Sequence, residues 1–197
     1  IETSEQLPEA DRYPLHVLMT MLEAERKMRR RAMLEAMSQS RFLELADRMI
    51  EAANAPRLLP ASDRASREAL LELVRAPFDR LMQTTLELPT EPADIDLHRI
   101  RIRAKRVRYA AEAVAPVIGK KAVRFASAAS VLQDALGELQ DSAVAHAWLS
   151  QAALEHPAVA FAAGQLAGFE LVRADSARRG WGKSWRKLSR EKLRSWM

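Results

Sequence analysis

The residues best suited to binding chemistry lie close together near the middle of this 197-residue chain. From His98 to Arg108 the sequence holds six Lys/Arg residues and no Asp or Glu. Five of the six are arginines, whose planar guanidinium groups match the oxygens of phosphate. Cations this dense repel one another unless acids from other elements or an anionic ligand balance them. The segment therefore predicts an anion-binding surface, and a merely solvated cationic face is the alternative.

Helical spacing sorts these residues onto separate faces. One stripe about 100° wide gathers five side chains, here called the central stripe: His98, Arg101, Lys105, Arg108 and Tyr109. The arginines of the central stripe would chelate phosphate oxygens, the lysine would act as a point charge, and the imidazole and phenol would donate hydrogen bonds. An apolar face, expected to be buried, contains Ile100, Ala104, Val107, Ala111 and Val114.

Smaller basic clusters lie elsewhere in the chain. Arg26 and Arg30 are four residues apart on one helix face, and three nearby glutamates are expected to neutralise part of their cluster. Arg41 follows in the next predicted helix. Lys121 lies at the start of a later helix, where a cation opposes the helix dipole. These four residues are secondary candidates for the same anion.

Residues 178–197 contain eight basic residues and one acid, together with three tryptophans at helical spacing. Such a basic amphipathic helix can lie on an anionic membrane or dock with a partner. The favoured interpretation is that its Trp face closes the helical bundle while its basic face extends the polyanion surface.

Other chemistry has little support in the sequence. Asp134, Glu138 and Asp141 share a helix face, where ion pairs with the arginine-rich helix are favoured over a metal site, and Asp141 is the best candidate. The chain has no cysteine, and its four histidines form no His-x-x-x-His or Glu-x-x-His pair. We therefore expect no metal site, no cofactor and no enzymatic activity.

The composition predicts an all-α fold, an antiparallel bundle of about six to seven helices, because Ala, Leu, Glu and Arg dominate over β-branched residues. The expected helices cover residues 15–37, 41–53, a segment ending near 88, 95–118, 120–155, a segment ending near 176, and 181–197. No apolar run approaches the roughly 18 residues of a membrane span. The single domain would cover residues 1–197.

Local signals mark the helix ends. An N-cap is expected within Ser38–Ser40 and another within Ala61–Asp63, and Gly119 is the expected C-cap of the arginine-rich helix. Pro77 should kink or split its helix, and a turn is expected at Arg179–Gly180.

The central stripe resembles the signature of the CHAD family, the conserved-histidine α-helical domain. That signature is a His, an Arg three residues on, a Lys four beyond it, and then Arg-Tyr. The family's next helix carries a Leu-Gln, Leu-Gly and Asp pattern, which Leu132-Gln133, Leu136-Gly137 and Asp141 match. Ser40-Arg41-Phe42 is similar to a turn of the same family.

The resemblance implies helical bundles whose basic faces line a channel or groove, inorganic polyphosphate as ligand, and a cytoplasmic location at polyphosphate granules. It implies no catalysis. The family usually has a first His/Arg-rich helix as well, and no such copy is found, so a missing N-terminal portion or a divergent short form is expected. General polyanion or non-specific nucleic-acid binding, and a helical interaction scaffold, are the alternatives.

Overall fold

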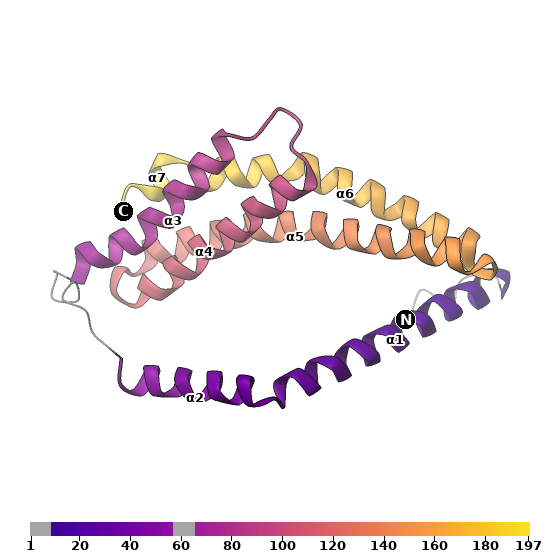
Figure 1. Cartoon of the computed structure of the whole chain (residues 1–197). Coiled ribbons are helices and arrows are strands. Elements are labelled where there is room, and N and C mark those ends of the chain that lie inside the picture. The colour runs from indigo at the N-terminus through magenta and orange to yellow at the C-terminus, as the bar shows by residue number, and fades with distance from the viewer. Residues whose placement is uncertain (1–8, 57–65) are drawn as a thin grey trace. The chain divides into compact units, whose positions relative to one another are not determined.

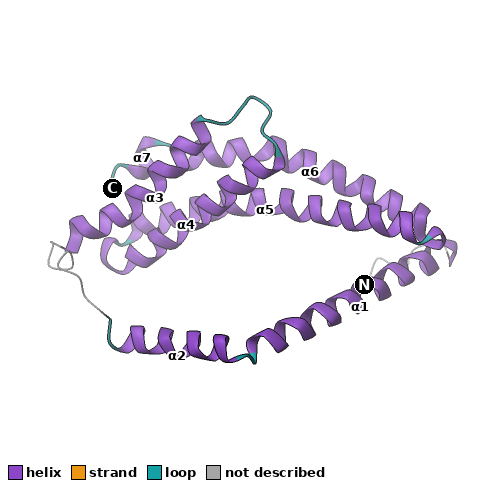
Figure 2. Cartoon of the chain, viewed as in Figure 1, coloured by secondary structure: helices purple, strands orange, loops and turns teal. Residues whose placement is uncertain are grey.

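The computed structural model describes residues 9–56 and 66–197, and these residues form helices and connecting turns without a β-strand (Figure 2). The elements, in chain order, are α1 (Glu9–Met37), α2 (Ser40–Asn54), α3 (Ser66–Leu86), α4 (Asp94–Ile118), α5 (Lys120–Glu155), the short 3-10 helix η3 (Pro157–Val159), α6 (Ala160–Leu188) and α7 (Glu191–Arg194) (Figure 1). The predicted all-α helical bundle is therefore confirmed. The expected cap within Ala61–Asp63 lies outside the described residues.

The chain divides into two compact units. Unit 1 takes in residues 1–62 and 149–165, and unit 2 takes in residues 63–148 and 166–197. Unit 1 has a small core, in which Leu18 of α1 and Val159 of η3 are buried. No residue of α2 is buried, although its apolar side chains repeat at helical spacing.

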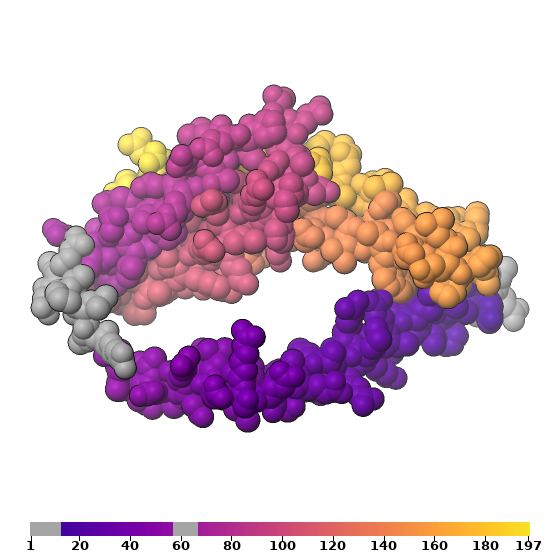
Figure 3. Space-filling view, in the orientation of Figure 1, coloured from indigo at the N-terminus to yellow at the C-terminus, as the bar shows by residue number. Residues whose placement is uncertain are grey.

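Unit 2 contains the main hydrophobic core. Consecutive helices run antiparallel, and α3 packs along α4 (Figures 1 and 3). The face of α4 predicted to be apolar is buried in full, since Ile100, Ala104, Val107, Ala111 and Val114 are at most 1% exposed. This burial fixes the rotation of α4 and thereby the direction of its polar side chains.

Helix ends agree with the sequence in some places and differ in others. Gly119 ends α4 with a positive φ of 81°, as expected, and its N–H donates to the carbonyl of Ala115. The N-cap expected within Ser38–Ser40 is Gln39, whose side chain makes no capping hydrogen bond. The Ser38 hydroxyl instead donates to the carbonyl of Glu35, 2.8 Å away, in the last turn of α1.

Two expected interruptions are absent. α3 continues through Pro77, because the buried side chains of Val74, Phe78 and Leu81 hold both halves of the helix on the same core. α6 also continues through Arg179–Gly180 to Leu188, so the predicted turn there is wrong. Tertiary packing therefore overrides the local breaking signals at both places.

The tryptophans of the C-terminal segment pack against the core, as the favoured interpretation predicts. Trp185 stacks on Phe78, with ring centres 6.4 Å apart, and Trp196 meets Phe125 edge-on at 5.8 Å. The segment is not one helix, because α6 ends at Leu188 and the four-residue α7 follows. Its tryptophan side chains pack against the hydrophobic core of unit 2.

Candidate anion-binding site

The central stripe lies along α4, beside the buried apolar face that anchors this helix. His98, Arg101 and Arg108 are half-buried, whereas Lys105 and Tyr109 are exposed. The structure therefore brings together all five residues of the predicted stripe on one helix, with the three inner side chains partly withdrawn from water.

Several polar atoms of the central stripe are buried without a hydrogen-bond partner. Five such side-chain atoms occur among the described residues, and three belong to the central stripe: His98 Nδ1, Arg101 Nε and Arg108 Nε. A fourth is the amide oxygen of Gln133, on α5. Buried donors without acceptors cost free energy, about 1–3 kcal/mol each. The two arginine nitrogens are therefore donors without a hydrogen-bonded acceptor in the described residues, and the Glu112 carboxylate 3.4 Å from Arg108 Nε forms only an ion pair with it.

Arg101 crosses α5 at Gly137. A Cβ atom added at Gly137 would lie 3.6 Å from Arg101 Nε, which is ordinary van der Waals contact. The group that uses the space beside this glycine is the arginine side chain. The Arg101 side chain therefore packs against the surface of α5 at Gly137.

Tyr109 orders the far end of the central stripe. Its ring centre lies 4.8 Å from Arg108 Cζ and 5.6 Å from Lys105 Nζ, within cation–π distance of both. Arg108 Nε also lies 3.4 Å from a carboxylate oxygen of Glu112, one turn along the helix. Glu112 was not predicted as part of the site, although its four-residue spacing from Arg108 was a usable signal.

Few acids neutralise α4. Among the described residues, the ion pairs of its basic segment are Arg99–Asp96 and Arg108–Glu112. The expectation that Asp134, Glu138 and Asp141 balance this helix is wrong for the described residues. All three are exposed, and none of them takes part in an ion pair of the described residues. Arg101 and Lys105 therefore keep their charge unpaired.

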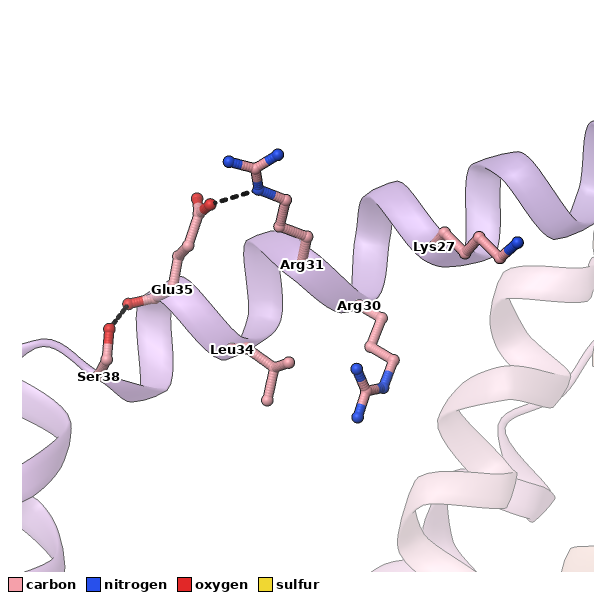
Figure 4. Close-up of a pocket in the computed structure, with 6 residues that line it drawn as sticks. All are labelled: Lys27, Arg30, Arg31, Leu34, Glu35 and Ser38. Carbon is pink, nitrogen blue, oxygen red and sulfur yellow. Dashed lines mark hydrogen bonds and ion pairs between the residues drawn. The ribbon is translucent and has the colours of Figure 1, made fainter.

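The cluster on α1 is more fully neutralised, as expected. Arg26 donates to both carboxylate oxygens of Glu23, at 2.8 and 3.1 Å, and this hydrogen bond lowers the pKa of Glu23. Figure 4 shows Arg31 Nε paired with one carboxylate oxygen of Glu35, while Arg30 extends from the helix and has no ion pair among the described residues (Figure 4).

The remaining secondary candidates lie outside the central stripe. Arg41 is exposed on α2, in unit 1. Lys121 lines a separate basic pocket in unit 2, which no residue of the central stripe lines. Of the nine predicted residues, five therefore form the central stripe, three belong to unit 1 and one lines this pocket.

Two further features of the described residues bear on the site. No group of three or more His, Asp or Glu side chains among them could hold a metal ion. None of their helices is both long and apolar enough to cross a membrane.

Comparison with known proteins identifies the family. No curated protein matches the chain in sequence. The family model described as the CHAD domain matches residues 2–150, which include all of α4 and the α5 motif at Gln133, Gly137 and Asp141. Because this match covers most of the sequence, the chain belongs to the CHAD domain family.

Proposed function

We propose that the chain binds inorganic polyphosphate through the central stripe. The observation that carries this proposal is a row of cations in which Arg101 Nε is buried without an acceptor and Arg108 Nε has Glu112 as its one acidic partner among the described residues. A structural ion-pair network would satisfy those nitrogens with carboxylates, and the described residues supply only Glu112, at 3.4 Å from Arg108. Membership of the CHAD family supports the same ligand.

The chemistry of polyphosphate suits this surface. The polymer carries about one negative charge per phosphate and has no bases, so it requires a row of donors and no stacking platform. From His98 to Tyr109 the helix rises roughly 16 Å, which allows several consecutive phosphates to lie along it. Arg101 and Arg108 would each chelate phosphate oxygens, and Lys105 would add a point charge between them.

The proposed role is binding without catalysis. The described residues hold no metal-ligand cluster, and the central stripe contains no carboxylate that could act as a general base toward a bound phosphate. A binding module of this kind would act in the cytoplasm, where it would attach its protein to polyphosphate granules. No cofactor enters this proposal.

The test is a calorimetric titration of long-chain polyphosphate at physiological salt, with an excess of double-stranded DNA as competitor. The stripe variant is Arg101→Ala/Lys105→Ala/Arg108→Ala. Its matched control is Arg67→Ala/Arg80→Ala/Lys183→Ala, which removes three exposed cations of unit 2 that have no ion pair among the described residues.

We expect polyphosphate binding that survives the DNA and that the stripe variant loses while the control keeps it. Displacement by DNA in proportion to its charge would indicate general polyanion binding instead. Equal binding by the stripe variant and the control would overturn the proposal, and would leave a helical scaffold as the better description.

A further inference from the structure

A second basic site lies in unit 2, where the start of α5 meets the α6–α7 junction. It is a pocket of about 320 Å³. Eight residues line it, and five of them are cations: Lys121, Arg124, Lys187, Arg190 and Lys192, with Leu193, Ser195 and Trp196. We call it the five-cation pocket.

The charge of the five-cation pocket is not balanced by the described residues. None of its five cations takes part in an ion pair there, and none of its lining residues is acidic. Glu191 is the one acid of residues 178–197, and it neither lines the pocket nor pairs with these cations. Lys121 also lies beside the positive end of the α5 dipole, which makes its position unfavourable without an anion.

The floor of the five-cation pocket is apolar and fixed. The Trp196 indole N–H donates to the Leu193 carbonyl at 2.9 Å, so the indole nitrogen is already occupied. The same ring meets Phe125 edge-on at 5.8 Å, which ties it to the core. The ring therefore gives the exposed cations around it a fixed apolar neighbour.

Size and charge together indicate the class of ligand. A volume of about 320 Å³ suits a compact molecule at the small end of ligand sites, not a polymer segment lying along a helix. Five cations exceed what a single phosphate requires. Two or three linked phosphate groups would match the charge, whether they belong to a nucleoside triphosphate or to a short inorganic phosphate chain.

We propose that the five-cation pocket binds a compact ligand carrying two or three linked phosphates, independently of the central stripe. Lys121 thus belongs to this second site and not to the polyphosphate surface on α4. In a nucleoside triphosphate the base would contact Trp196, whereas an inorganic chain would use the cations alone.

The test is calorimetric titration with ATP, tripolyphosphate and orthophosphate in separate runs, on the full chain. The pocket variant is Lys121→Ala/Lys187→Ala/Lys192→Ala, whose three side chains are exposed, and Arg67→Ala/Arg80→Ala is the control. The stripe variant of the previous section is titrated in parallel, so that failure of the two proposals can be distinguished.

We expect tripolyphosphate to bind, orthophosphate to bind at least tenfold more weakly, and the pocket variant to lose at least tenfold in affinity. The control and the stripe variant should retain the wild-type affinity. Tighter binding of ATP than of tripolyphosphate would identify the nucleotide as the source of the phosphates, and equal or weaker binding would identify the inorganic chain.

The proposal is overturned if the pocket variant binds like the wild type, or if only the stripe variant loses binding. A second measurement needs no substitution, namely lysine acylation of the wild type read by mass spectrometry. Tripolyphosphate should protect Lys121 and Lys187 from acylation but leave Lys183 reactive, and uniform reactivity would contradict the proposal.

Discussion

Replacing Arg101 by methionine should weaken ligand binding while making unit 2 more stable. The substitution keeps most of the aliphatic stem and removes the guanidinium group, whose Nε lies beside Gly137. In the wild type this group has a buried Nε without an acceptor and no acidic partner among the described residues. The two effects therefore have opposite signs.

The magnitudes follow from the surroundings of Arg101. A buried unsatisfied donor costs about 1–3 kcal/mol. Because the arginine is only half-buried, we take the low end and expect the free energy of unfolding to rise by about 1 kcal/mol. Hydrogen bonds from a charged donor to phosphate contribute about 1.5–3 kcal/mol. The dissociation constant for polyphosphate should therefore rise by roughly 10- to 150-fold.

Two measurements on the same protein test this prediction. Urea unfolding followed by tryptophan fluorescence reports on unit 2, which contains all four tryptophans of the chain. Calorimetric titration reports the affinity. Arg106→Met is the matched control, because Arg106 is exposed on the same helix but lies outside the central stripe. It should change the stability by less than about 0.5 kcal/mol.

A loss of stability in Arg101→Met together with unchanged affinity would refute the reasoning. That result would mean that the Arg101 guanidinium supports the fold through contacts within the chain. Equal losses of affinity in Arg101→Met and Arg106→Met would mean that net charge alone governs binding.

Substitutions at three other positions probe the same unit. Gly137→Ala should raise the unfolding free energy by up to about 1 kcal/mol without loss of affinity, whereas Gly137→Leu should displace Arg101 and weaken binding at least tenfold in calorimetry. Glu112→Gln should remove the ion pair with Arg108, which stabilises the helix by about 0.3–0.5 kcal/mol, and should tighten polyphosphate binding roughly twofold. Weaker binding would show that the Glu112 carboxylate positions the arginine. Arg178→Ala should lower the unfolding free energy by about 1 kcal/mol, because Arg178 donates to the Pro92 carbonyl at 2.6 Å and pairs with Asp94 at the start of α4. Urea unfolding measures this loss, and an unchanged unfolding midpoint would contradict the prediction.

The sequence could predict the central stripe because a single helix decides its geometry. Ile100, Ala104 and Val107 have helical spacing, so their burial fixes where His98 and Arg101 point. The Gly119 cap was predictable for the same reason, since a positive φ at a helix end favours glycine.

Features that depend on contacts between distant segments were not predictable in this way. The Arg179–Gly180 turn is absent because packing of Trp185 on Phe78 keeps α6 helical beyond that point. The five-cation pocket combines residues more than 60 positions apart in the sequence. Helical spacing describes one helix at a time and does not show which helix supplies a neighbour.

Helical spacing also did not predict which acids form ion pairs between helices. Asp141 lies at a suitable register to face an arginine-rich neighbour, yet no described ion pair includes it. The pair that joins α6 to the start of α4 instead uses Arg178 and Asp94. Ion pairs within one helix, such as Arg26–Glu23, followed directly from spacing.

The most direct test of polyphosphate binding by the central stripe is its dependence on salt. Polyphosphate affinity is measured from low to physiological salt for the wild type and for Arg101→Ala/Lys105→Ala/Arg108→Ala. By analogy with single-stranded nucleic acids, each phosphate contact contributes about 0.7 to the slope of log K against log salt. Loss of three contacts should therefore reduce the slope by about 2, together with a large loss of affinity. An unchanged slope and affinity in the variant would contradict the assignment of the ligand to this helix.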